Sequence, residues 1–262
     1  MHSAFSGDSD SAPIDMINAA KSKRLRGITF TDHLDYDFFD EPGIFDLDIP
    51  VYFESQSALA QKESTSNFTI LTGIEVGLQK SCITRNNNAI NSKDFDFVIG
   101  STHQVDGRDP YFDSFWEGKD EHDLFMRYYE TVLENLNTFS NFDTVAHLDY
   151  IFRYSRKDKL QDTYTPYAEL VDAILEKTIK MDKALEINTG AYIKKMLEPN
   201  PGLQIIKRYH ELGGKLITIG ADAHEPKNVA IGFEKLPELL NNCGFKEFAV
   251  YKKRIPTLYP LN

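Results

Sequence analysis

The chain alternates short, β-branched apolar runs with longer amphipathic stretches, and this rhythm limits the folds open to it. The apolar runs are nearly continuous, as is typical of strands buried on both faces of a parallel sheet. They lie at residues 27–31, 69–76, 95–101, 144–147, 184–188 and 216–221. Repeated alternation of strand and helix predicts an α/β protein with a parallel sheet, either open or closed into a barrel.

The amphipathic stretches are typical of helices. Residues 13–25 begin with a proline and are followed by Gly27, which is the usual order of helix start and stop signals. Three further helices are expected, at residues 123–136, 166–181 and 201–212. The segment 35–50 is irregular, acidic and aromatic, so it is expected to be a loop, either near a functional site or simply packed on the surface.

Length and composition narrow the class of protein. No low-complexity linker divides the 262 residues, a size that an α/β barrel commonly reaches as one domain. The net charge of -11 argues against a long nucleic-acid partner, since that affinity comes largely from Lys and Arg. No run is long enough to span a bilayer, so no membrane association is expected. Cys82 and Cys243 form no disulfide framework, which favours a reducing compartment and hence the cytoplasm.

Nearly every predicted strand carries a His, Asp or Glu at or just beyond its carboxyl end. These residues are Asp32, His33, Glu75, His103, His147, Asp149, Glu186, Asp222 and His224. In a barrel, all such ends face one mouth, where functional groups meet. One histidine at a strand end is more often a capping or core residue, but four at successive ends favour a site. Imidazole and carboxylate without thiolate suit Zn²⁺, Mn²⁺ or Fe²⁺.

Two further segments carry candidate ligands. Asp222 and His224 are separated by one residue, so in extended backbone both side chains point to the same side and can share one metal cluster. Near the amino terminus, His2 and Asp8 lie in a polar segment before the first predicted helix. The alternative is that Asp8 and Asp10 are capping residues and that His2 belongs to a frayed end.

The motifs together resemble one known family. MHSAFSGDSD, TDH, GIE, GSTH, AHLD and GADAH occur in the order found in the polymerase-and-histidinol-phosphatase (PHP) superfamily. The phrases FDFVIGSTHQVDG, HLDYIFRY and ALEINTGAY are similar to its histidinol-phosphatase branch, and the resemblance covers nearly the whole chain. It implies a distorted (β/α)7 TIM-like barrel with parallel strands, outer helices and up to three divalent metal ions (Zn, Mn or Fe).

The resemblance also implies a ligand set. One metal would be bound by His2, Glu75 and Asp222, a second by the bridging Glu75 with His103 and His147, and a third by Asp8, His33 and His224. The family begins with H-x-H after a first strand, whereas this sequence opens at Met1-His2. We therefore expect one domain over residues 1–262 whose first strand and first histidine are missing through truncation. Asp8 stands where some relatives have histidine, and carboxylate binds the same metals.

The activity implied by the resemblance is hydrolysis of L-histidinol phosphate, a small phosphate monoester, in histidine biosynthesis. We expect a hydroxide bridging the Glu75-linked metals to attack phosphorus, with Asp222 or His224 as the proton relay. Arg153 is the candidate phosphate clamp because a guanidinium group can bind phosphate through two hydrogen bonds. The alternative interpretation is that Arg153 is an ordinary surface residue. Ser101 and Asn188 are weaker candidates for hydrogen bonds to the substrate.

Competing interpretations stay open at this point. Other members of the superfamily act on nucleotides or other small phosphoesters, and the missing histidine allows a catalytically impaired metal-binding module. His122 and His210 lie within helical patterns and are expected to be structural. The aromatic segment 111–116, which includes Trp116, is expected to be either a lid or packing. The oligomeric state is not predicted.

Overall fold

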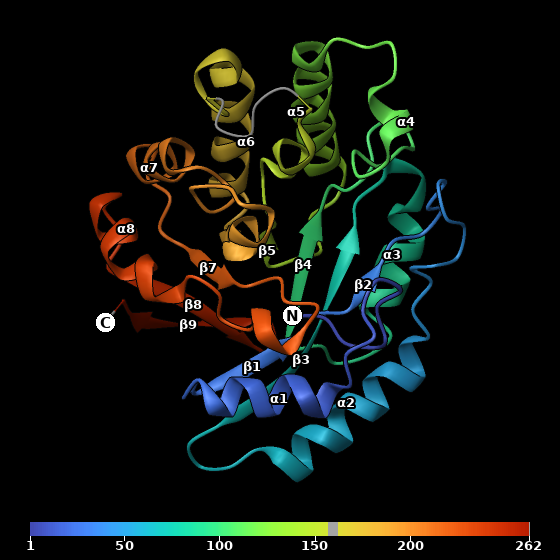
Figure 1. Ribbon diagram of the computed structural model, residues 1–262, viewed down its shortest axis with the longest axis vertical. Coiled ribbons are helices and arrows are strands. Elements are labelled where there is room, and N and C mark those ends of the chain that lie inside the picture. Colours follow the sequence, from blue (N-terminus) through green and yellow to red (C-terminus); the bar gives the residue numbers. More distant parts are fainter. Residues whose placement is uncertain (157–161, 262) are drawn as a thin grey trace.

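A curved parallel sheet forms the centre of the protein, and helices lie along its outside (Figure 1). The computed structural model describes residues 1–156 and 162–261. The strands are β1 (Gly27–Phe30), β2 (His33–Leu34), β3 (Thr69–Gly77), β4 (Phe97–Ser101), β5 (Thr144–Val145), β6 (Ala184–Asn188) and β7 (Ile217–Gly220). They are ordered β1-β3-β4-β5-β6-β7, with β2 also on β3, and every pair is parallel. The predicted α/β, TIM-like architecture is confirmed.

The edge formed by β1 and β2 is one strand with an interruption. β1 pairs with the first half of β3, where Gly27 lies opposite Thr69, and β2 pairs with the second half, where His33 lies opposite Glu75. The chain leaves the sheet only at residues 31 and 32. This register puts a histidine and a glutamate side by side at the carboxyl ends of neighbouring strands.

The first residues of the chain lie between β1 and the end of β7. The carbonyl of Met1 accepts a hydrogen bond from the Thr31 amide at 2.9 Å, and the Met1 amine donates to the Thr29 carbonyl at 3.3 Å. On the other side, the His2 amide donates to the Ala223 carbonyl at 2.9 Å. The segment thereby joins the two ends of the sheet and delivers His2 to the end where the strands finish.

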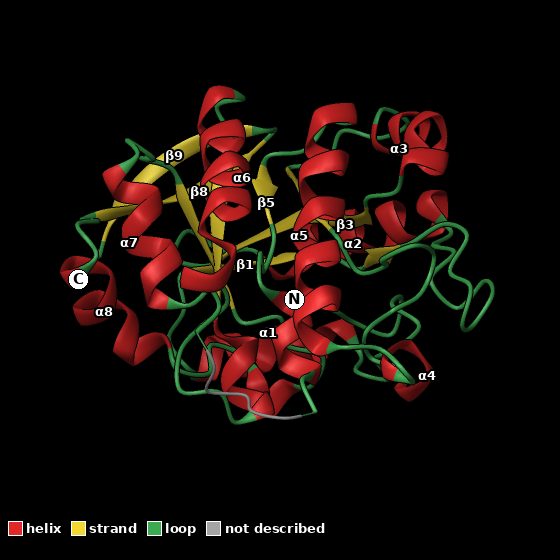
Figure 2. Cartoon of the chain, turned by 90° about the horizontal axis from the view of Figure 1, so that it is seen from above, coloured by secondary structure: helices red, strands yellow, loops and turns green. Residues whose placement is uncertain are grey.

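Helices surround the sheet on its outer side, as Figures 1 and 2 show. They are α1 (Pro13–Ser22), α2 (Ile49–Glu63), α3 (Ile83–Ile90), α4 (Asp113–Trp116), α5 (Glu121–Thr138), α6 (Ala168–Lys180), α7 (Leu203–Glu211) and α8 (Leu236–Asn242). The predicted helices correspond to α1, α5, α6 and α7, with ends shifted by a few residues. The segment 35–50 is a loop as far as Asp48, whose side chain caps α2 by accepting from the Val51 amide at 3.1 Å.

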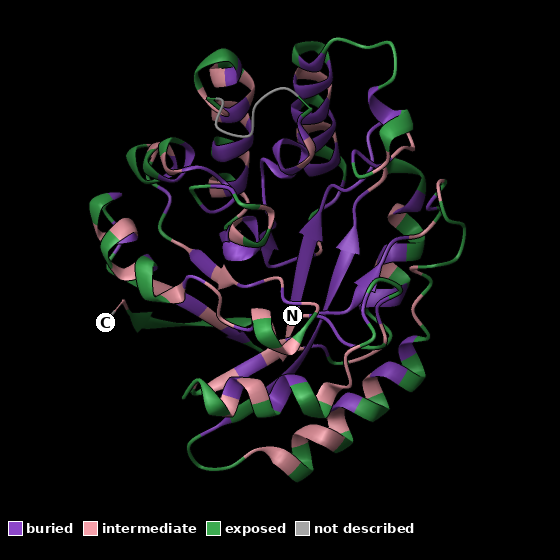
Figure 3. Cartoon of the chain, viewed as in Figure 1, coloured by how far each residue is buried: buried purple, intermediate pink, exposed green. Residues whose placement is uncertain are grey.

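The core lies between the sheet and the helices. Figure 3 shows β3 and β4 coloured as buried along nearly their whole length, and β3 is buried at every residue after Thr69. Residues Ile74, Val98, Leu185 and Ile217 from four strands have no exposed surface. Strands buried on both faces explain the continuous apolar runs of the sequence. No helix in the described part of the chain has the length and apolar character needed to cross a membrane.

A carboxyl-terminal hairpin covers the amino ends of the central strands. It consists of β8 (Glu247–Lys252) and β9 (Ile255–Pro260), which pair antiparallel. The Arg254 amide donates to the Asp96 carbonyl at 2.9 Å, and the Tyr251 hydroxyl donates to the Asp143 carbonyl at 3.4 Å. Because Asp96 and Asp143 directly precede β4 and β5, the hairpin lies at the end of the sheet opposite the strand ends that carry the histidines.

Candidate metal centre

Glu75 is the central side chain of a buried polar cluster at the carboxyl ends of the strands. It lies within β3 and is 3% exposed. One carboxylate oxygen, Oε1, is 3.2 Å from Nε2 of His103 and 3.2 Å from Nε2 of His147. The other oxygen, Oε2, is 3.4 Å from Nε2 of His2. A single carboxylate therefore faces imidazoles from three distant parts of the chain.

The group formed by Glu75, His103 and His147 has the spacing of a metal site. The Nε2 atoms of the two histidines face each other at 3.4 Å. Ligands held tetrahedrally at the usual zinc distances are about 3.3 Å apart, so the separations of 3.2 to 3.4 Å match such a set. Without a cation, these three atoms avoid mutual repulsion only if protons lie between them. The donor set therefore fits a divalent cation.

A second group shares Glu75 and uses His2 and Asp222. Nε2 of His2 is 3.1 Å from Oδ1 of Asp222. Asp222 follows β7 with a positive φ of 49°, a left-handed conformation that short polar residues such as aspartate adopt more readily than most. The ligand-type atoms of His2, Glu75 and Asp222 all lie within 4.8 Å of one another, as do those of Glu75, His103 and His147.

A third group lies nearer to the surface and contains Asp8, His33 and His224. Oδ2 of Asp8 is 3.0 Å from Nε2 of His224 and 3.7 Å from Nε2 of His33. The His2 ring stacks on both of the other imidazoles, with centroid distances of 4.2 Å to His33 and 4.1 Å to His224, and those two rings are 5.8 Å from each other. The Asp8 side chain is 39% exposed and that of His224 is 26% exposed, so this group forms the open side of the centre.

When no cation is present, the electrostatics of the cluster favour charged carboxylates and the protonated forms of His2 and His103, whereas burial and then the charge of His2 lower the pKa of His33 to about 4. Burial opposes charge on His2, but its hydrogen bonds to Asp222 and Glu75 outweigh burial and raise its pKa to about 10. Burial lowers the pKa of His103, but the neighbouring carboxylates of Asp35 and Glu75 outweigh burial and raise this pKa well above its usual value. The neighbouring imidazoles hold the pKa of Glu75 well below its ordinary value despite burial. A cation can replace these protons.

Arg153 borders the cluster, and one of its nitrogens has no hydrogen-bond partner among the described residues. Its guanidinium is buried, with Nε donating to Oδ1 of Asn200 at 2.6 Å and Nη1 donating to Oδ2 of Asp222 at 3.0 Å. Nη2 is buried and has no hydrogen-bond partner in the described structure. A buried donor without a partner costs roughly 1–3 kcal/mol, which binding of an anion would relieve.

The two weaker substrate-binding candidates contact cluster residues. The Ser101 hydroxyl donates to Oε1 of Glu75 at 2.6 Å. The Asn188 amide donates to Glu186 at 3.1 Å and to Asp222 at 3.3 Å, while its oxygen accepts from the Gly190 amide. Both side chains are buried and bonded to acidic neighbours, an arrangement that holds the candidate ligands in place.

Sequence reasoning missed Asp35 and Asp109 near the cluster, and it noted Glu186 at a strand end without giving it a role. Asp35 lies 2.8 Å from Nδ1 of His103 through Oδ1. Glu186 accepts the His147 amide at 3.0 Å. Asp109 accepts the Tyr150 hydroxyl at 3.2 Å, and burial raises the pKa of this carboxyl to about 6. Asp35 lies two residues from His33, which is the only local signal that could have pointed to it, whereas the strand-end position of Glu186 already marked that residue.

The residues set aside as structural lie outside the cluster. Nδ1 of His122 contacts the Tyr167 hydroxyl at 3.2 Å, and His210 packs edge-on against Phe245. Trp116 is 8% exposed and its indole donates to the Pro110 carbonyl at 2.8 Å, so it belongs to the packing of its loop.

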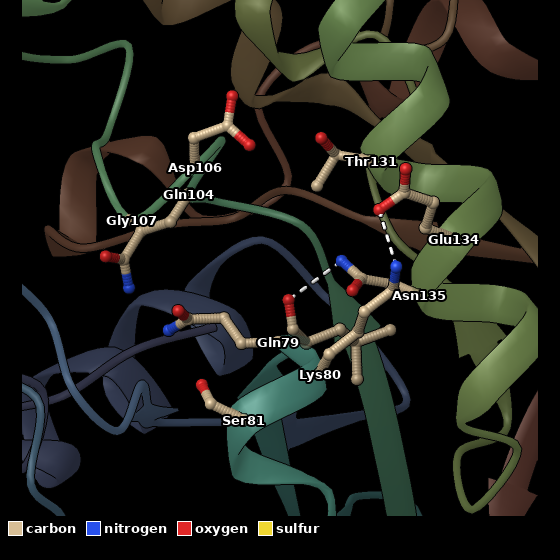
Figure 4. Close-up of a pocket in the computed structure, with 10 residues that line it drawn as sticks. Gln79, Lys80, Ser81, Gln104, Asp106, Gly107, Thr131, Glu134 and Asn135 are labelled. Atoms are coloured by element: carbon tan, nitrogen blue, oxygen red, sulfur yellow. Dashed lines mark hydrogen bonds and ion pairs between the residues drawn. The ribbon is translucent and has the colours of Figure 1, made fainter.

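A separate pocket of about 180 Å³ lies between α5 and the segments that follow β3 and β4 (Figure 4). Its lining residues are Leu78, Gln79, Lys80, Ser81, Gln104, Asp106, Gly107, Thr131, Glu134 and Asn135. None of the predicted site residues lines this pocket.

Comparison with known proteins gives consistent matches over most of the chain. Residues 1–190 match the family model described as the PHP domain. A probable histidinol-phosphatase from Clostridium acetobutylicum is 32% identical over 256 residues, covering 97% of this chain and 96% of that protein. A histidinol-phosphatase from Lactococcus lactis is 31% identical, covering 95% of this chain and 92% of that protein.

Solved structures show the same likeness. A crystal structure of histidinol phosphate phosphatase from Lactococcus lactis, in complex with zinc, L-histidinol and phosphate, has a TM-score of 0.88 and 30% identity. The alignment covers 98% of this chain and 97% of that one. A putative histidinol phosphatase from Listeria monocytogenes has a TM-score of 0.75 at 18% identity, with coverage of 89% and 97%, and shares the fold.

Proposed function

The chain belongs to the PHP domain family, and we propose that it is a metal-dependent histidinol-phosphatase. It would hydrolyse L-histidinol phosphate to L-histidinol and phosphate, as a step of histidine biosynthesis in the cytoplasm. The observation that carries this proposal is the cluster of imidazoles and carboxylates around Glu75, beside which Nη2 of Arg153 lies without a hydrogen-bond partner in the described part of the chain. The relatives named as histidinol-phosphatases, and the Lactococcus lactis complex with zinc, L-histidinol and phosphate, support it.

We assign the candidate ligands to as many as three divalent cations of the Zn, Mn or Fe type. His2, Glu75 and Asp222 would hold one, and Glu75, His103 and His147 a second. Asp8, His33 and His224 would hold a third at the open side. When bound, such cations neutralise phosphate charge and make water a competent nucleophile near neutral pH.

The protein's own groups position the phosphate. Arg153 carries a permanent charge, its two other nitrogens are held by Asn200 and Asp222, and Nη2 is available to a phosphate oxygen. A guanidinium held in this way has little freedom to lose when the substrate binds. We assign Arg153 as the phosphate clamp, and Ser101 and Asn188 as the residues that orient Glu75 and Asp222.

Asp222 and His224 were the two candidates for transferring a proton to the leaving group. Asp222 already contacts His2 and Arg153 through its two oxygens, and His224 points its Nε2 at Asp8. We therefore propose that the main role of both residues is to bind metal. Of the two, His224 is the more exposed and so the better placed to exchange protons with solvent.

One assay tests the proposal. Purified protein is supplied with Mn²⁺ or Zn²⁺, and phosphate release is measured with L-histidinol phosphate and with a panel of nucleoside monophosphates and small phosphodiesters. We expect metal-dependent turnover with the highest kcat/KM for L-histidinol phosphate, abolished by a chelator. Higher kcat/KM on a nucleotide would contradict the proposed substrate. Metal binding without turnover on any of these substrates would indicate a binding module.

A further inference from the structure

Asp35 places its carboxylate between two imidazoles that belong to different groups of the metal centre. It directly follows β2 and is 2% exposed, and its backbone amide donates to the Phe45 carbonyl at 3.2 Å. Oδ1 is 2.8 Å from Nδ1 of His103, and Oδ2 is 3.7 Å from Nδ1 of His33. Oδ2 has no hydrogen-bond partner in the described structure.

The two imidazoles both direct Nδ1 at Asp35 and Nε2 at the centre. Nε2 of His103 faces Glu75 at 3.2 Å, and Nε2 of His33 faces Asp8 at 3.7 Å. A carboxylate next to Nδ1 favours the tautomer with its proton on Nδ1, which leaves Nε2 free to bind a cation. Only the contact with His103 is a hydrogen bond, because Nδ1 of His33 has no hydrogen-bond partner in the described structure and its contact with Oδ2 at 3.7 Å is electrostatic. The two rings are 5.2 Å apart and nearly perpendicular, so one carboxylate faces both.

Gly77 provides the space that this carboxylate occupies. A Cβ atom at Gly77 would lie 1.9 Å from Oδ1 of Asp35 and 2.5 Å from its Cγ. The glycine is the last residue of β3, within the sheet ladder where it lies opposite Ser101, and its backbone does not require a glycine conformation. The absence of a side chain is therefore explained by Asp35. Glu75 lies two residues earlier on the same face of β3, so the bridging carboxylate and this space are neighbours.

We propose that Asp35 is a positioning residue that orients His103 and His33 together and so couples two of the metal subsites. Gly77 makes this arrangement possible, because a side chain at this position would occupy the space of the Asp35 carboxylate. The proposal rests on the metal centre of the proposed function but not on the identity of the substrate.

Zinc binding to the chelator-treated protein tests the role of Asp35. Asp35→Asn keeps the size of the side chain and removes the charge that selects the tautomer. We expect the affinity for Zn²⁺, measured by competition with a chromophoric chelator, to fall roughly 10- to 100-fold with unchanged stoichiometry. The absorption spectrum of the Co²⁺-loaded protein should change, because two ligand rings are no longer held. The matched control is Asp37→Asn, on the same loop, where the carboxylate pairs with Arg85 at the surface.

The outcomes separate the possible roles of Asp35. Wild-type zinc affinity and Co²⁺ spectrum in Asp35→Asn would overturn the proposal. Loss of one bound zinc per chain would also overturn it, because Asp35 would then be a direct ligand. All readouts are made without substrate, so failure of the wild type to hydrolyse L-histidinol phosphate would refute the proposed function and leave this test intact.

A double-mutant cycle tests the role of Gly77. Gly77→Ala should lower both the melting temperature and the zinc affinity. Adding Asp35→Ala removes the two atoms that would clash and keeps Cβ of residue 35, at 3.2 Å. The double variant should therefore regain melting temperature relative to Gly77→Ala, while its zinc affinity equals that of Asp35→Ala alone. A double variant that melts as low as Gly77→Ala would show that the space at Gly77 is not reserved for Asp35.

Discussion

Arg153 donates a hydrogen bond from Nη1 to Oδ2 of Asp222, 3.0 Å away, and this bond connects the proposed phosphate clamp directly to a proposed metal ligand. Asn200 fixes the guanidinium from the other side through Nε. The two contacts leave Nη2 as the available donor group. Phosphate binding and cation binding should therefore depend on each other at this point.

Arg153→Lys should weaken substrate binding. Lysine keeps the charge but cannot contact Asn200, Asp222 and a phosphate oxygen at once. We expect kcat/KM to fall roughly 10- to 100-fold, which corresponds to about 1.4 to 3 kcal/mol, mainly through a higher KM. Steady-state kinetics on L-histidinol phosphate measures this, with Arg156→Lys, an exposed arginine paired with Asp113, as the control. Unchanged kcat and KM would exclude Arg153 as the clamp.

Glu75→Gln and His147→Ala should each abolish turnover without unfolding the protein. Glu75 contacts three imidazoles, so its loss disrupts two groups of the cluster at once. Activity and bound metal, determined by elemental analysis, should both fall, while the circular dichroism spectrum stays native. The control is Glu63→Gln, a carboxylate paired with Lys21 far from the centre. Near-normal rates in either site variant would remove the metal-pair mechanism.

Metal binding at pH 7 should release protons. The pKa of His2 is raised to about 10 and that of His103 is raised well above its usual value, so both are protonated at pH 7 when no cation is bound. A cation binds only the unprotonated nitrogen, so apparent affinity should rise as the pH increases from 6 to 9. Calorimetric titration of the metal-free protein in buffers of different ionisation enthalpy measures the protons released. A binding heat that does not depend on the buffer would contradict the assignment.

Asp109 should make the metal-free protein less stable as the pH rises from about 4 to 6. Burial raises its pKa to about 6 in the folded state, against an ordinary value of 3.8. Across this window the unfolded chain loses its proton before the folded chain does, so the free energy of unfolding falls with rising pH and is then level. Asparagine does not ionise, so the free energy of unfolding of Asp109→Asn should not fall in this way. Relative to the wild type, it should rise by about 2 to 3 kcal/mol between pH 4 and pH values above 6.

Denaturant unfolding of both proteins at several pH values from 4 to 8 checks the prediction. Asp113→Asn, whose side chain is 84% exposed, should show no such pH-dependent difference. A wild-type-minus-variant difference that stays constant across the window would mean that Asp109 is not responsible.

The parallel sheet and most of the cluster could be predicted from the sequence, because both follow from patterns of residues that are close together in the chain. Each buried strand has its polar residue at the same end, so knowing that the sheet is parallel brings Glu75, His103, His147 and Asp222 together. The hydrogen-bonding of the Arg153 guanidinium could not be read in this way. It depends on Asn200, which approaches from a separate loop.

The unpredicted parts are those whose partners are remote or whose pattern is weak. Asp35 contacts His103, 68 positions further along the chain, and nothing in the segment 35–50 marks it as different from its acidic neighbours. The strand β9 is exposed at all six residues and contains two prolines, so it lacks the apolar alternation that predicts a strand. The helix α2 was missed because its start lies within an irregular segment and it carries only a weak apolar stripe.

The bonds of His2 to Ala223 and Asp222 have a consequence for how the protein matures. These contacts join the two ends of the sheet, so residues from the beginning of the chain and from beyond β7 must both be in place before the group of His2, Glu75 and Asp222 exists. A chain still emerging from the ribosome can form β3 and β4 and bring His103 beside Glu75. The group of His2, Glu75 and Asp222 is complete only after β7 has been synthesised, whereas Glu75, His103 and His147 all precede β6, so the two groups become available at different points of the chain.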